Sequence, residues 1–583
     1  MRLVKFVLSP EPPVKGAEPL YLRLSGGAAV KENGILMPEG SVLLTDTYFN
    51  VLSAKYFRYA EMTFPYLELE YRGDIAVELR FRGREREELL AGANFSSEQA
   101  DVAHIDIPVR DYGEGFVYVA VTSLKDDSVV TGGGYFTSAK PRRVKLGVVI
   151  CTFKREEYVK NNVKRLAGHA ALHPEFKRDV GIFVVDNGRT LDATSFPEGA
   201  RLIPNANTGG AGGFTRGLRE VVAEGDYTHF LFMDDDIALE PFVIERTVKL
   251  LAVMKESYYD ACIGGSMLML DKPVVQHELG ARWLGNAIKG NLKDLDLSSP
   301  KGLLENERDL PTDYCAWWYM CMPVSAAEKA GFPLELLFVK LDDVEFGLRA
   351  ARQFILINGI GVWHENFDYK STSFYEYFNK RNFLILSSRY PRGKGMLSDW
   401  WMLVRAVGKA LVEQNYFVID LVLRAYDDFL AGADYVAGLD PNDLIRELAS
   451  VCPKQNPAEE IEAALGLDLD SELKKSASVK KKFFREFFTL NSYLIPSCFY
   501  RKVAVAHMVK PRPIDFYKTK RAVHYNPYTR TAYVTEIRKR ELFSAGAALL
   551  KMFFKMLFGY KKAAASFRTY PPAPTTSERL CKK

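Results

Sequence analysis

Apolar and polar positions follow three successive patterns along the chain, which change near residues 142 and 395. Up to about Pro141, short runs such as YLELEY and FVYVAVTS alternate apolar and polar residues and are separated by Gly, Asp, Asn and Pro. Alternation of this kind is typical of strands with one buried face. Several such strands at short spacing predict an N-terminal β-sandwich domain over residues 1–142.

From Val144 onward, apolar β-branched runs alternate with segments of helical spacing. Strands are predicted at VKLGVVICTF, VGIFVVDNG and THFLFMDDD, with helical segments after the first two. This order predicts a multidomain α/β protein whose central, Rossmann-like domain has a mainly parallel sheet over residues 143–395. Ligands on such sheets bind at the carboxyl ends of the strands. Three predicted strands end in polar residues there, namely Thr152, Asp186 and the run Asp234–Asp236.

Residues 396–583 are expected to form a helical C-terminal region with a basic tail. From Ser471 onward, 25 Lys and Arg residues stand against 6 Asp and Glu residues, although the formal net charge of the whole chain is only +5. An acidic body with a basic tail indicates a tail that meets an anionic surface. Basic patches also bind nucleic acid, but no recognisable nucleic-acid-binding module accompanies this one.

Within the tail, the segment Phe543–Lys562 is apolar nearly all round, with Lys551 and Lys555 on one helical face. It suits a helix that lies in a membrane interface, reinforced by the basic runs Lys480–Lys482 and Arg538–Arg540. A buried C-terminal helix with a solvated charged face is the alternative. The charge of the tail favours peripheral contact with a membrane.

Cysteine usage and the lengths of apolar runs indicate a reducing compartment. The seven cysteines form no CxxC pair, which disfavours a zinc ribbon or a secreted disulfide framework. The N-terminal residues show no signal peptide, and no uncharged run reaches the ~20 residues of a membrane-spanning helix. We therefore expect a cytoplasmic protein at the inner face of the cell membrane.

The sharpest chemical feature is the run Met233–Asp236 at the end of an apolar strand. In an extended chain residues i and i+2 face the same way, so Asp234 and Asp236 can converge on one cation. Two carboxylates at a strand end suit a hard divalent ion that also holds a substrate phosphate. A turn or a helix cap is the alternative, because Asp is common in both.

A second acidic cluster, Asp342 and Asp343, follows an apolar run and opens a predicted helix. Asp342 with Glu345 has the form of a capping box, with Asp in place of Ser or Thr. Capping leaves Asp343 without a task in the first turn, where the helix dipole would keep its carboxylate ionised and ready to accept a proton. We therefore predict that Asp343 is a general base.

His364 ends another short apolar run and is the candidate third metal ligand. A neutral imidazole is a common metal ligand, although a histidine beside Trp363 is also often simply packed. An Asp/Asp/His set with phosphate oxygens would favour Mn2+, with Mg2+ possible.

Two further motifs have both a functional and a packing interpretation. The adjacent pair Trp317 and Trp318 could face a sugar or pack in the core, and an extended segment lets at most one of them face a binding site. The glycine-rich loop Pro204–Gly217 lacks the ending of a P-loop, which disfavours nucleoside-triphosphate hydrolysis. Its glycines suit either an anion at a helix N-terminus or a tight strand-to-helix turn.

Taken together, these motifs resemble those of the GT-A-fold, family-2 glycosyltransferases. More narrowly, the chain is similar to the polymerising galactofuranosyltransferases that build mycobacterial-type cell-wall galactan. The resemblance runs from about Thr45 to about Arg389 and rests on VVICTFKR, FVVDNG, NTGGAGGFTRG, FMDDDI, AWW, LDDVEFGLRA, WHENF and YEYFNKRN. The basic stretch beyond about Ser471 matches no motif of that family.

The resemblance implies a GT-A fold for the central domain, often a homo-oligomeric assembly, and a role for each matching residue. The implied metal ligands are Asp234, Asp236 and His364, with Asp343 as the base. The implied donor-binding residues are Thr152, Phe153, Arg155, Asp186, Asn207 and Asp235. The implied residues of the acceptor or sugar site are Trp317, Trp318 and Asp342.

The activity implied by the resemblance is an inverting, metal-dependent transfer of galactofuranose from UDP-galactofuranose to a glycan or polyprenyl-linked glycan, in cell-wall polysaccharide biosynthesis. Asp343 would take the proton from the attacking hydroxyl, and a single displacement would invert the anomeric configuration. The alternatives are a rhamnosyl- or other hexosyltransferase of the same fold, and a catalytically inert glycan-binding or scaffold protein. Because the two aspartates, the histidine and the base are all present, we expect an enzyme.

Overall fold

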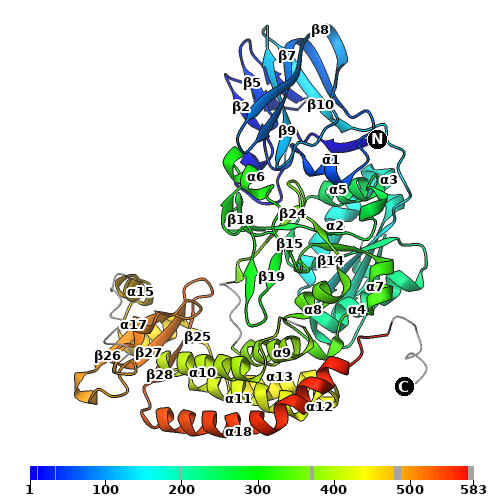
Figure 1. The fold of residues 1–583 in the computed structure, drawn as a ribbon. Coiled ribbons are helices and arrows are strands. Elements are labelled where there is room, and N and C mark those ends of the chain that lie inside the picture. Colours follow the sequence, from blue (N-terminus) through cyan, green and yellow to red (C-terminus); the bar gives the residue numbers. More distant parts are fainter. Residues whose placement is uncertain are drawn as a thin grey trace.

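The computed structural model describes residues 1–8, 11–32, 34–196, 199–367, 373–390, 392–477 and 488–574. Figure 1 shows an N-terminal β domain (blue) at one end of the molecule, an α/β region in the middle and a layer of helices at the other end. A small sheet, drawn in orange, lies beside these helices.

Strands β1 to β10 form one antiparallel ten-stranded sheet in the N-terminal domain. The long strand β7 (Tyr66–Gly83) pairs along its length with β8 (Glu87–Asp106). Its first half also pairs with β10 (Ser128–Phe136), and its second half pairs with β9 (Gly115–Ser123). The sheet is therefore continuous, because the one strand β7 pairs with both of its halves.

The other elements of this domain are short. They are β1 (Arg2–Lys5), β2 (Arg23–Ser25), β3 (Ala29–Lys31), β4 (Gly34–Met37), β5 (Val42–Leu44), β6 (Leu52–Ser53) and α1 (Lys55–Tyr59). The loop between β5 and β6 joins the domain to the middle region, since the Tyr48 hydroxyl donates to the Ile360 carbonyl at 2.9 Å. The buried Arg246 guanidinium reaches the same loop and donates to the Phe49 carbonyl at 2.6 Å.

The middle region is built on a seven-stranded sheet of order β13-β12-β11-β14-β22-β16-β23. The first four strands of that order are parallel, and they are β13 (Ala200–Pro204), β12 (Val180–Asp186), β11 (Leu146–Thr152) and β14 (His229–Asp234). The remaining strands are β22 (Met320–Pro323), β16 (Cys262–Gly264) and β23 (Phe354–Ile355), of which β22 runs antiparallel to β14. The sheet is thus mainly parallel, with one antiparallel strand in its second half.

A second, five-stranded sheet continues from the end of β14 in the order β15-β24-β17-β18-β21. Its strands are β15 (Ile237–Ala238), β24 (Gly361–His364), β17 (Ser266–Met269), β18 (Val275–Glu278) and β21 (Leu295–Asp296), with the hairpin β19 (Ala281–Trp283) and β20 (Ile288–Gly290) nearby in the sequence. The helices of the middle region are α2 (Glu156–Leu172), α3 (Pro174–Asp179), α4 (Gly209–Ala223), α5 (Pro241–Ala252), α6 (Pro300–Asn306), α7 (Val324–Ala330) and α8 (Asp342–Ala350).

The glycine-rich run lies at the start of α4 and packs directly against the sheet. A Cβ added at Gly213 would lie 2.2 Å from the Cys151 sulfur, and one at Gly217 would lie 2.3 Å from the Val149 side chain. Gly209 has φ +68°, and a Cβ there would lie 2.1 Å from a backbone carbonyl. Close packing of α4 therefore explains these three glycines, and it favours the packing interpretation of the run.

The C-terminal layer consists of long helices packed on one another. They are α9 (Tyr375–Arg389), α10 (Met396–Val412), α11 (Tyr416–Ala431), α12 (Ala433–Gly438), α13 (Pro441–Ser450) and α18 (Arg540–Thr569). In the described part of the chain, α18 is the one helix that is long and apolar enough, by length and composition, to cross a membrane. One face of α18 is nevertheless packed, because Met552, Met556 and Tyr560 are buried among the other helices.

The C-terminal region, expected to be helical, also contains a sheet. Between α13 and α18 the chain forms a four-stranded sheet of β25 (Asn456–Pro457), β26 (Arg501–His507), β27 (Thr519–Asn526) and β28 (Thr531–Glu536). The helices α14 (Ala458–Leu465), α15 (Leu469–Ala477) and α17 (Pro513–Phe516) lie along the same stretch of chain. Strand β27 is buried from Ala522 to Asn526, and the high density of basic residues hides it in the sequence. The basic run Lys480–Lys482 lies outside the described residues.

Candidate active site

Asp234, Asp236 and His364 come together at the carboxyl edge of the parallel strands. Asp234 ends β14 and Asp236 lies in the turn that leads to β15. Strand β15 pairs with β24 so that Ile237 lies opposite His364, which places the imidazole beside the acidic turn. His364 Nε2 lies 3.2 Å from an Asp236 carboxylate oxygen and 3.9 Å from one of Asp234. One ligand atom of each residue lies within 4.8 Å of the others.

The protonation state of His364 suits metal binding. Its Nδ1 lies 2.6 Å from the Glu365 carbonyl oxygen, which can only accept a hydrogen bond. Nδ1 therefore carries a proton, and Nε2 points toward the Asp236 carboxylate, where it is a metal ligand when the ring is neutral. Two such acceptors face each other favourably only around a cation or a proton. The donor set of two carboxylates and one imidazole fits a divalent ion such as Mn2+ or Mg2+.

Asp235, between the two aspartates, is held inside the protein. Thr152 Oγ1 donates to its carboxylate at 2.7 Å, and Asn162 donates to its backbone carbonyl at 2.9 Å. Arg155 lies 3.3 Å from Asp235 and 2.6 Å from Asp236. Burial and the neighbouring Asp236 charge raise the pKa of Asp235 to about 6, although Arg155 opposes this. Thr152 and Arg155, expected at the donor site, thus also organise the acidic turn.

The other expected donor residues lie at the ends of the neighbouring strands. Asp186 is buried at the end of β12 and accepts hydrogen bonds from the backbone of Gly188 at 2.9 Å and of Leu191 at 2.7 Å. Asn207, just before α4, donates to Asn442 at 3.0 Å. Phe153 is 44% exposed directly after β11, so its ring is available to a ligand.

Asp342 and Asp343 begin α8, but no capping box forms there. The N-cap is Leu341, which has a left-handed backbone (φ 66°). No side chain caps the helix with a hydrogen bond there. Glu345 instead pairs with Arg349 at 2.8 Å and accepts from the Tyr390 hydroxyl at 2.8 Å. The sequence prediction of a capping box is therefore wrong, because a strained backbone, and not a side chain, turns the chain into the helix.

Burial, rather than the helix dipole, dominates the ionisation of the acidic pair. Burial raises the pKa of Asp343, against the opposing effect of its hydrogen bond from the Val344 backbone. Burial and the Asp343 charge together raise the pKa of Asp342. Burial thus opposes the ionisation that was expected for Asp343 at a helix start, and a raised pKa makes its carboxylate a better proton acceptor once ionised.

The loop before this pair is strained and held by buried polar side chains that the sequence reasoning did not single out. Phe338, Lys340 and Leu341 all have positive φ values, of 64°, 69° and 66°. Asn382, fully buried in α9, donates to the Val339 carbonyl at 3.0 Å and to the Lys340 carbonyl at 2.8 Å. Strain of this kind persists only where the surroundings enforce it, as at many functional sites. The motif YEYFNKRN, which contains Asn382, could have indicated this role.

Another carboxyl group, Glu278, joins the acidic pair without having been singled out in the sequence. It ends β18, and burial raises its pKa to about 7, with Asp343 adding to the shift and Lys293 opposing it. The effect of Asp343 on Glu278 places the two groups within electrostatic reach of each other. A protonated Glu278 would be a hydrogen-bond donor beside the expected base.

The metal-ligand cluster and the acidic pair lie around the same strand ends. Asp235, Asp234 and Asp342 all raise the pKa of the Cys151 thiol, after the effect of its removal from water. The Phe367 ring lies 5.2 Å from the His364 ring and 6.0 Å from the Lys340 ammonium nitrogen. The Lys340 charge in turn opposes the raised pKa of both carboxyls of the acidic pair, Asp342 and Asp343. The tertiary structure thus brings three distant segments of the chain to one edge of the sheet.

Trp317 and Trp318 are both buried, with 5% and 4% of their surfaces exposed. The Trp317 ring packs 5.0 Å from Phe214 and 4.9 Å from Phe232, so core packing explains it. The Trp318 indole donates to the Gly265 carbonyl at 3.0 Å, and its ring centre lies 6.3 Å from that of Phe367, beside the metal-ligand cluster. Trp318 therefore lies near the expected site.

Known proteins match this chain over the region just described and beyond it. Residues 147–286 match the family model described as Glycosyl transferase family 2. The galactofuranosyltransferase GlfT2 of Mycobacterium tuberculosis is 27% identical over 428 residues, which cover 67% of this chain and 65% of that relative. The GlfT2 of Mycolicibacterium smegmatis is 27% identical over 451 residues, covering 71% of this chain and 67% of that relative. The matched part spans about two thirds of the length of these relatives.

Among solved structures, the mannosyltransferase PcManGT from Pyrobaculum calidifontis, in complex with GDP-Man and Mn2+, is similar with a TM-score of 0.29 and 13% identity. The similarity covers 61% of this chain and 88% of that chain, and at this TM-score it carries no argument about function. The family match and the two curated relatives support one another. The chain carries a glycosyl transferase family 2 domain and is similar over most of its length to mycobacterial galactofuranosyltransferases.

Proposed function

We propose that the protein is an inverting, divalent-metal-dependent glycosyltransferase that uses a UDP-sugar, with Asp343 as general base. The observation that carries this proposal is the convergence of Asp234, Asp236 and His364 at the carboxyl edge of a parallel sheet. Bound there, a divalent cation supplies the charge that stabilises a departing nucleoside diphosphate. The acidic pair Asp342 and Asp343 at the start of α8 supplies the proton acceptor, which is Asp343.

The residues around the metal ligands bind and orient the donor in this proposal. Phe153 offers its exposed ring to the nucleobase, and Thr152 and Arg155 hold the acidic turn that faces the diphosphate. Asp186 and Asn207 complete the binding site for the nucleotide. Trp318 contributes to the binding site for the sugar. Asp343 accepts the proton of the acceptor hydroxyl, whose oxygen attacks the anomeric carbon opposite the nucleotide. Holding these groups in line accounts for several kcal/mol of the barrier.

Galactofuranose is the sugar we propose, because both curated relatives are named galactofuranosyltransferases. The acceptor in this proposal is a hydroxyl group of a glycan or of a lipid-linked glycan. A screen of UDP- and dTDP-sugars with Mn2+ tests the donor directly, by release of the nucleotide and by mass change of the acceptor. Transfer only from a dTDP-hexose would replace the galactofuranose proposal with that of a rhamnosyl- or other hexosyltransferase. If no donor supports transfer, the remaining alternative is a catalytically inert glycan-binding or scaffold protein.

The pH dependence of transfer follows from the environment of Asp343. A base works only when ionised, and burial raises its pKa above the ordinary value of about 3.9 for aspartate. Activity is therefore expected to be constant above this raised pKa and to fall about tenfold per pH unit below it. The measurement is the initial rate of transfer against pH, with UDP binding measured at each pH. A rate that stays level while UDP remains bound would contradict the assignment of the base.

We propose that the exposed face of α18 contacts an anionic membrane surface. The side chains of Phe543, Phe554, Leu557 and Phe558 are between 50% and 83% exposed along this helix, next to the exposed Lys551. The opposite face holds the helix on the protein, since the Tyr560 hydroxyl donates to Asp399 at 2.5 Å. Lys555, on the same face as Lys551, pairs with Asp427 at 2.6 Å. A helix anchored on one face and apolar on the other suits an interfacial position.

The double substitution Phe554→Glu, Phe558→Glu is expected to lower binding to anionic vesicles at least about tenfold, because burying one Phe contributes roughly 1.5–3 kcal/mol. Deleting the helix would be a poor test, since its other face is part of the helical core. The matched control is Phe64→Glu, where a phenylalanine in the N-terminal domain is 80% exposed. Equal sedimentation of the double variant and this control with vesicles would contradict the membrane proposal.

A further inference from the structure

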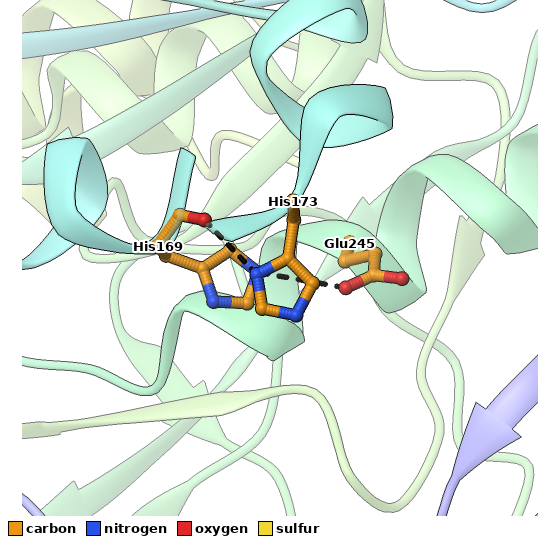
Figure 2. Close-up of side chains that lie close together, drawn as sticks. All are labelled: His169, His173 and Glu245. Atoms are coloured by element: carbon orange, nitrogen blue, oxygen red, sulfur yellow. Dashed lines mark hydrogen bonds and ion pairs between the residues drawn. The ribbon is translucent and has the colours of Figure 1, made fainter. Parts of the chain in front are cut away.

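A second cluster of metal-ligating side chains lies away from the candidate active site. His169 is in the last turn of α2, His173 joins α2 to α3, and Glu245 lies in the middle of α5. One ligand atom of each lies within 4.8 Å of the others. Figure 2 shows the two imidazole rings stacked beside the Glu245 carboxylate, with ring centres 3.9 Å apart.

The hydrogen bonds of the cluster leave imidazole nitrogens for a ligand. His173 Nδ1 lies 2.9 Å from the His169 carbonyl oxygen, so Nδ1 carries the proton and Nε2 keeps its lone pair. His169 Nε2 is buried and, among the described residues, has no hydrogen-bond partner. The Glu245 carboxylate is its nearest acidic neighbour, at 3.5 Å. A buried ring nitrogen whose nearest partner is a carboxylate 3.5 Å away either points a proton at that carboxylate or shares a cation with it.

The donor types distinguish this cluster from the aspartate-rich one. Two imidazole nitrogens and one carboxylate form a ligand set that Zn2+ takes with a fourth position open. Hard ions such as Mg2+ prefer oxygen ligands, so this set selects a different metal from that of the active site. The backbone hydrogen bond of His173 also orients its ring, as the outer partners of metal-bound histidines do.

The surroundings provide access and a fourth ligand. His173 and Glu245 line a cavity of about 1180 Å³ that is bounded by the N-terminal domain at Met1 and Phe136 and by the residues where β11 and β12 begin. These strand starts form the edge of the sheet opposite Thr152 and Asp186. Water in the cavity can complete the coordination of an ion held on its wall. The site is therefore separate from the transferase centre by the length of the strands.

We propose that His169, His173 and Glu245 form a Zn2+ site that joins α2 and α3 to α5 beneath the N-terminal domain. The competing interpretation is an ordinary ion pair between His169 and Glu245, with Lys249 3.9 Å from the same carboxylate. Only the metal site requires His173. The two interpretations therefore differ in what the loss of His173 does.

The test uses the full-length chain without a histidine tag, freed of metal by chelation. The substitution Asp236→Ala is included throughout, so that the aspartate-rich site does not contribute. Calorimetry with Zn2+ and the visible absorption of bound Co2+ measure the site without any assay of transfer. We expect one Zn2+ per chain, a tetrahedral Co2+ spectrum and a melting temperature that rises with added Zn2+.

His173→Ala is expected to weaken Zn2+ binding at least about 100-fold, since even outer partners of such ligands contribute 10- to 100-fold. Glu245→Gln should also weaken Zn2+ binding. Added Zn2+ should then no longer raise the melting temperature of this variant. The matched control is His104→Ala, which removes an exposed histidine that pairs with Asp106 in the N-terminal domain. Unchanged Zn2+ affinity in His173→Ala, or no Zn2+ binding by the parent, would overturn the proposal.

Discussion

Asp236→Ala is expected to abolish Mn2+-dependent binding of UDP and to lower the rate of transfer roughly 1000-fold, because metal stabilisation of the leaving group is worth several kcal/mol. The substitution removes the carboxylate oxygen that lies 3.2 Å from His364 Nε2 and leaves a single carboxylate, Asp234, beside the imidazole. Calorimetric titration with UDP, with and without Mn2+, measures the loss.

Two further variants make the result for Asp236 interpretable. Asp236→Asn keeps the size of the side chain and a partner for Arg155, so its UDP affinity reports the metal and not the packing of the turn. Asp260→Ala removes a surface carboxylate whose partner is Arg352, and it should bind UDP normally. If Asp236→Ala melts like the parent and binds UDP with unchanged, Mn2+-dependent affinity, the metal assignment fails.

Asp343→Asn should retain binding of Mn2+ and UDP but lower kcat about 100- to 10,000-fold, the range typical of a lost general base. The amide keeps the shape of the side chain and can still accept from the Val344 backbone, which is 2.8 Å away. It cannot take the proton of an acceptor hydroxyl. The decisive measurement is the rate of transfer at saturating donor and acceptor, with UDP affinity measured on the same preparation.

The neighbouring carboxyl provides the sharpest comparison for Asp343. Asp342→Asn removes the other member of the pair, and a larger loss of kcat in this variant would move the role of base to Asp342. Asp434→Asn changes an exposed aspartate in the first turn of α12, a similar helical position far from the site in sequence, and should leave kcat unchanged. Near-normal turnover of Asp343→Asn would exclude it as the base.

Local sequence patterns predicted the strands that carry the site. The apolar runs before Thr152, Asp186 and Asp234 are β11, β12 and β14, and each ends where the pattern places its end. Asp234 and Asp236 do converge, but not by the two-residue repeat of an extended chain, because β14 ends at Asp234 and Asp236 lies in the turn that follows. Such patterns are readable because the period of burial depends on the backbone geometry of each element alone.

Patterns that depend on local backbone detail or on charge were less informative. The Asp342 and Glu345 spacing predicts a capping box, but a left-handed Leu341 starts the helix instead. The run around Val523 and Tyr525 is a buried strand of a sheet that the basic residues conceal. In both cases tertiary packing overrides a weak local preference.

What the sequence by itself determined is the α/β order of the central domain and the acidic strand ends. Only the tertiary structure decided the partners: the β15–β24 register brings His364 to Asp236 across more than a hundred residues, and α5 brings Glu245 to His169 and His173. It also decided the environment of Asp343, since burial raises the pKa of this carboxyl. Contacts between distant segments and the loss of water around a charge arise only once the chain has packed, so no local pattern records them.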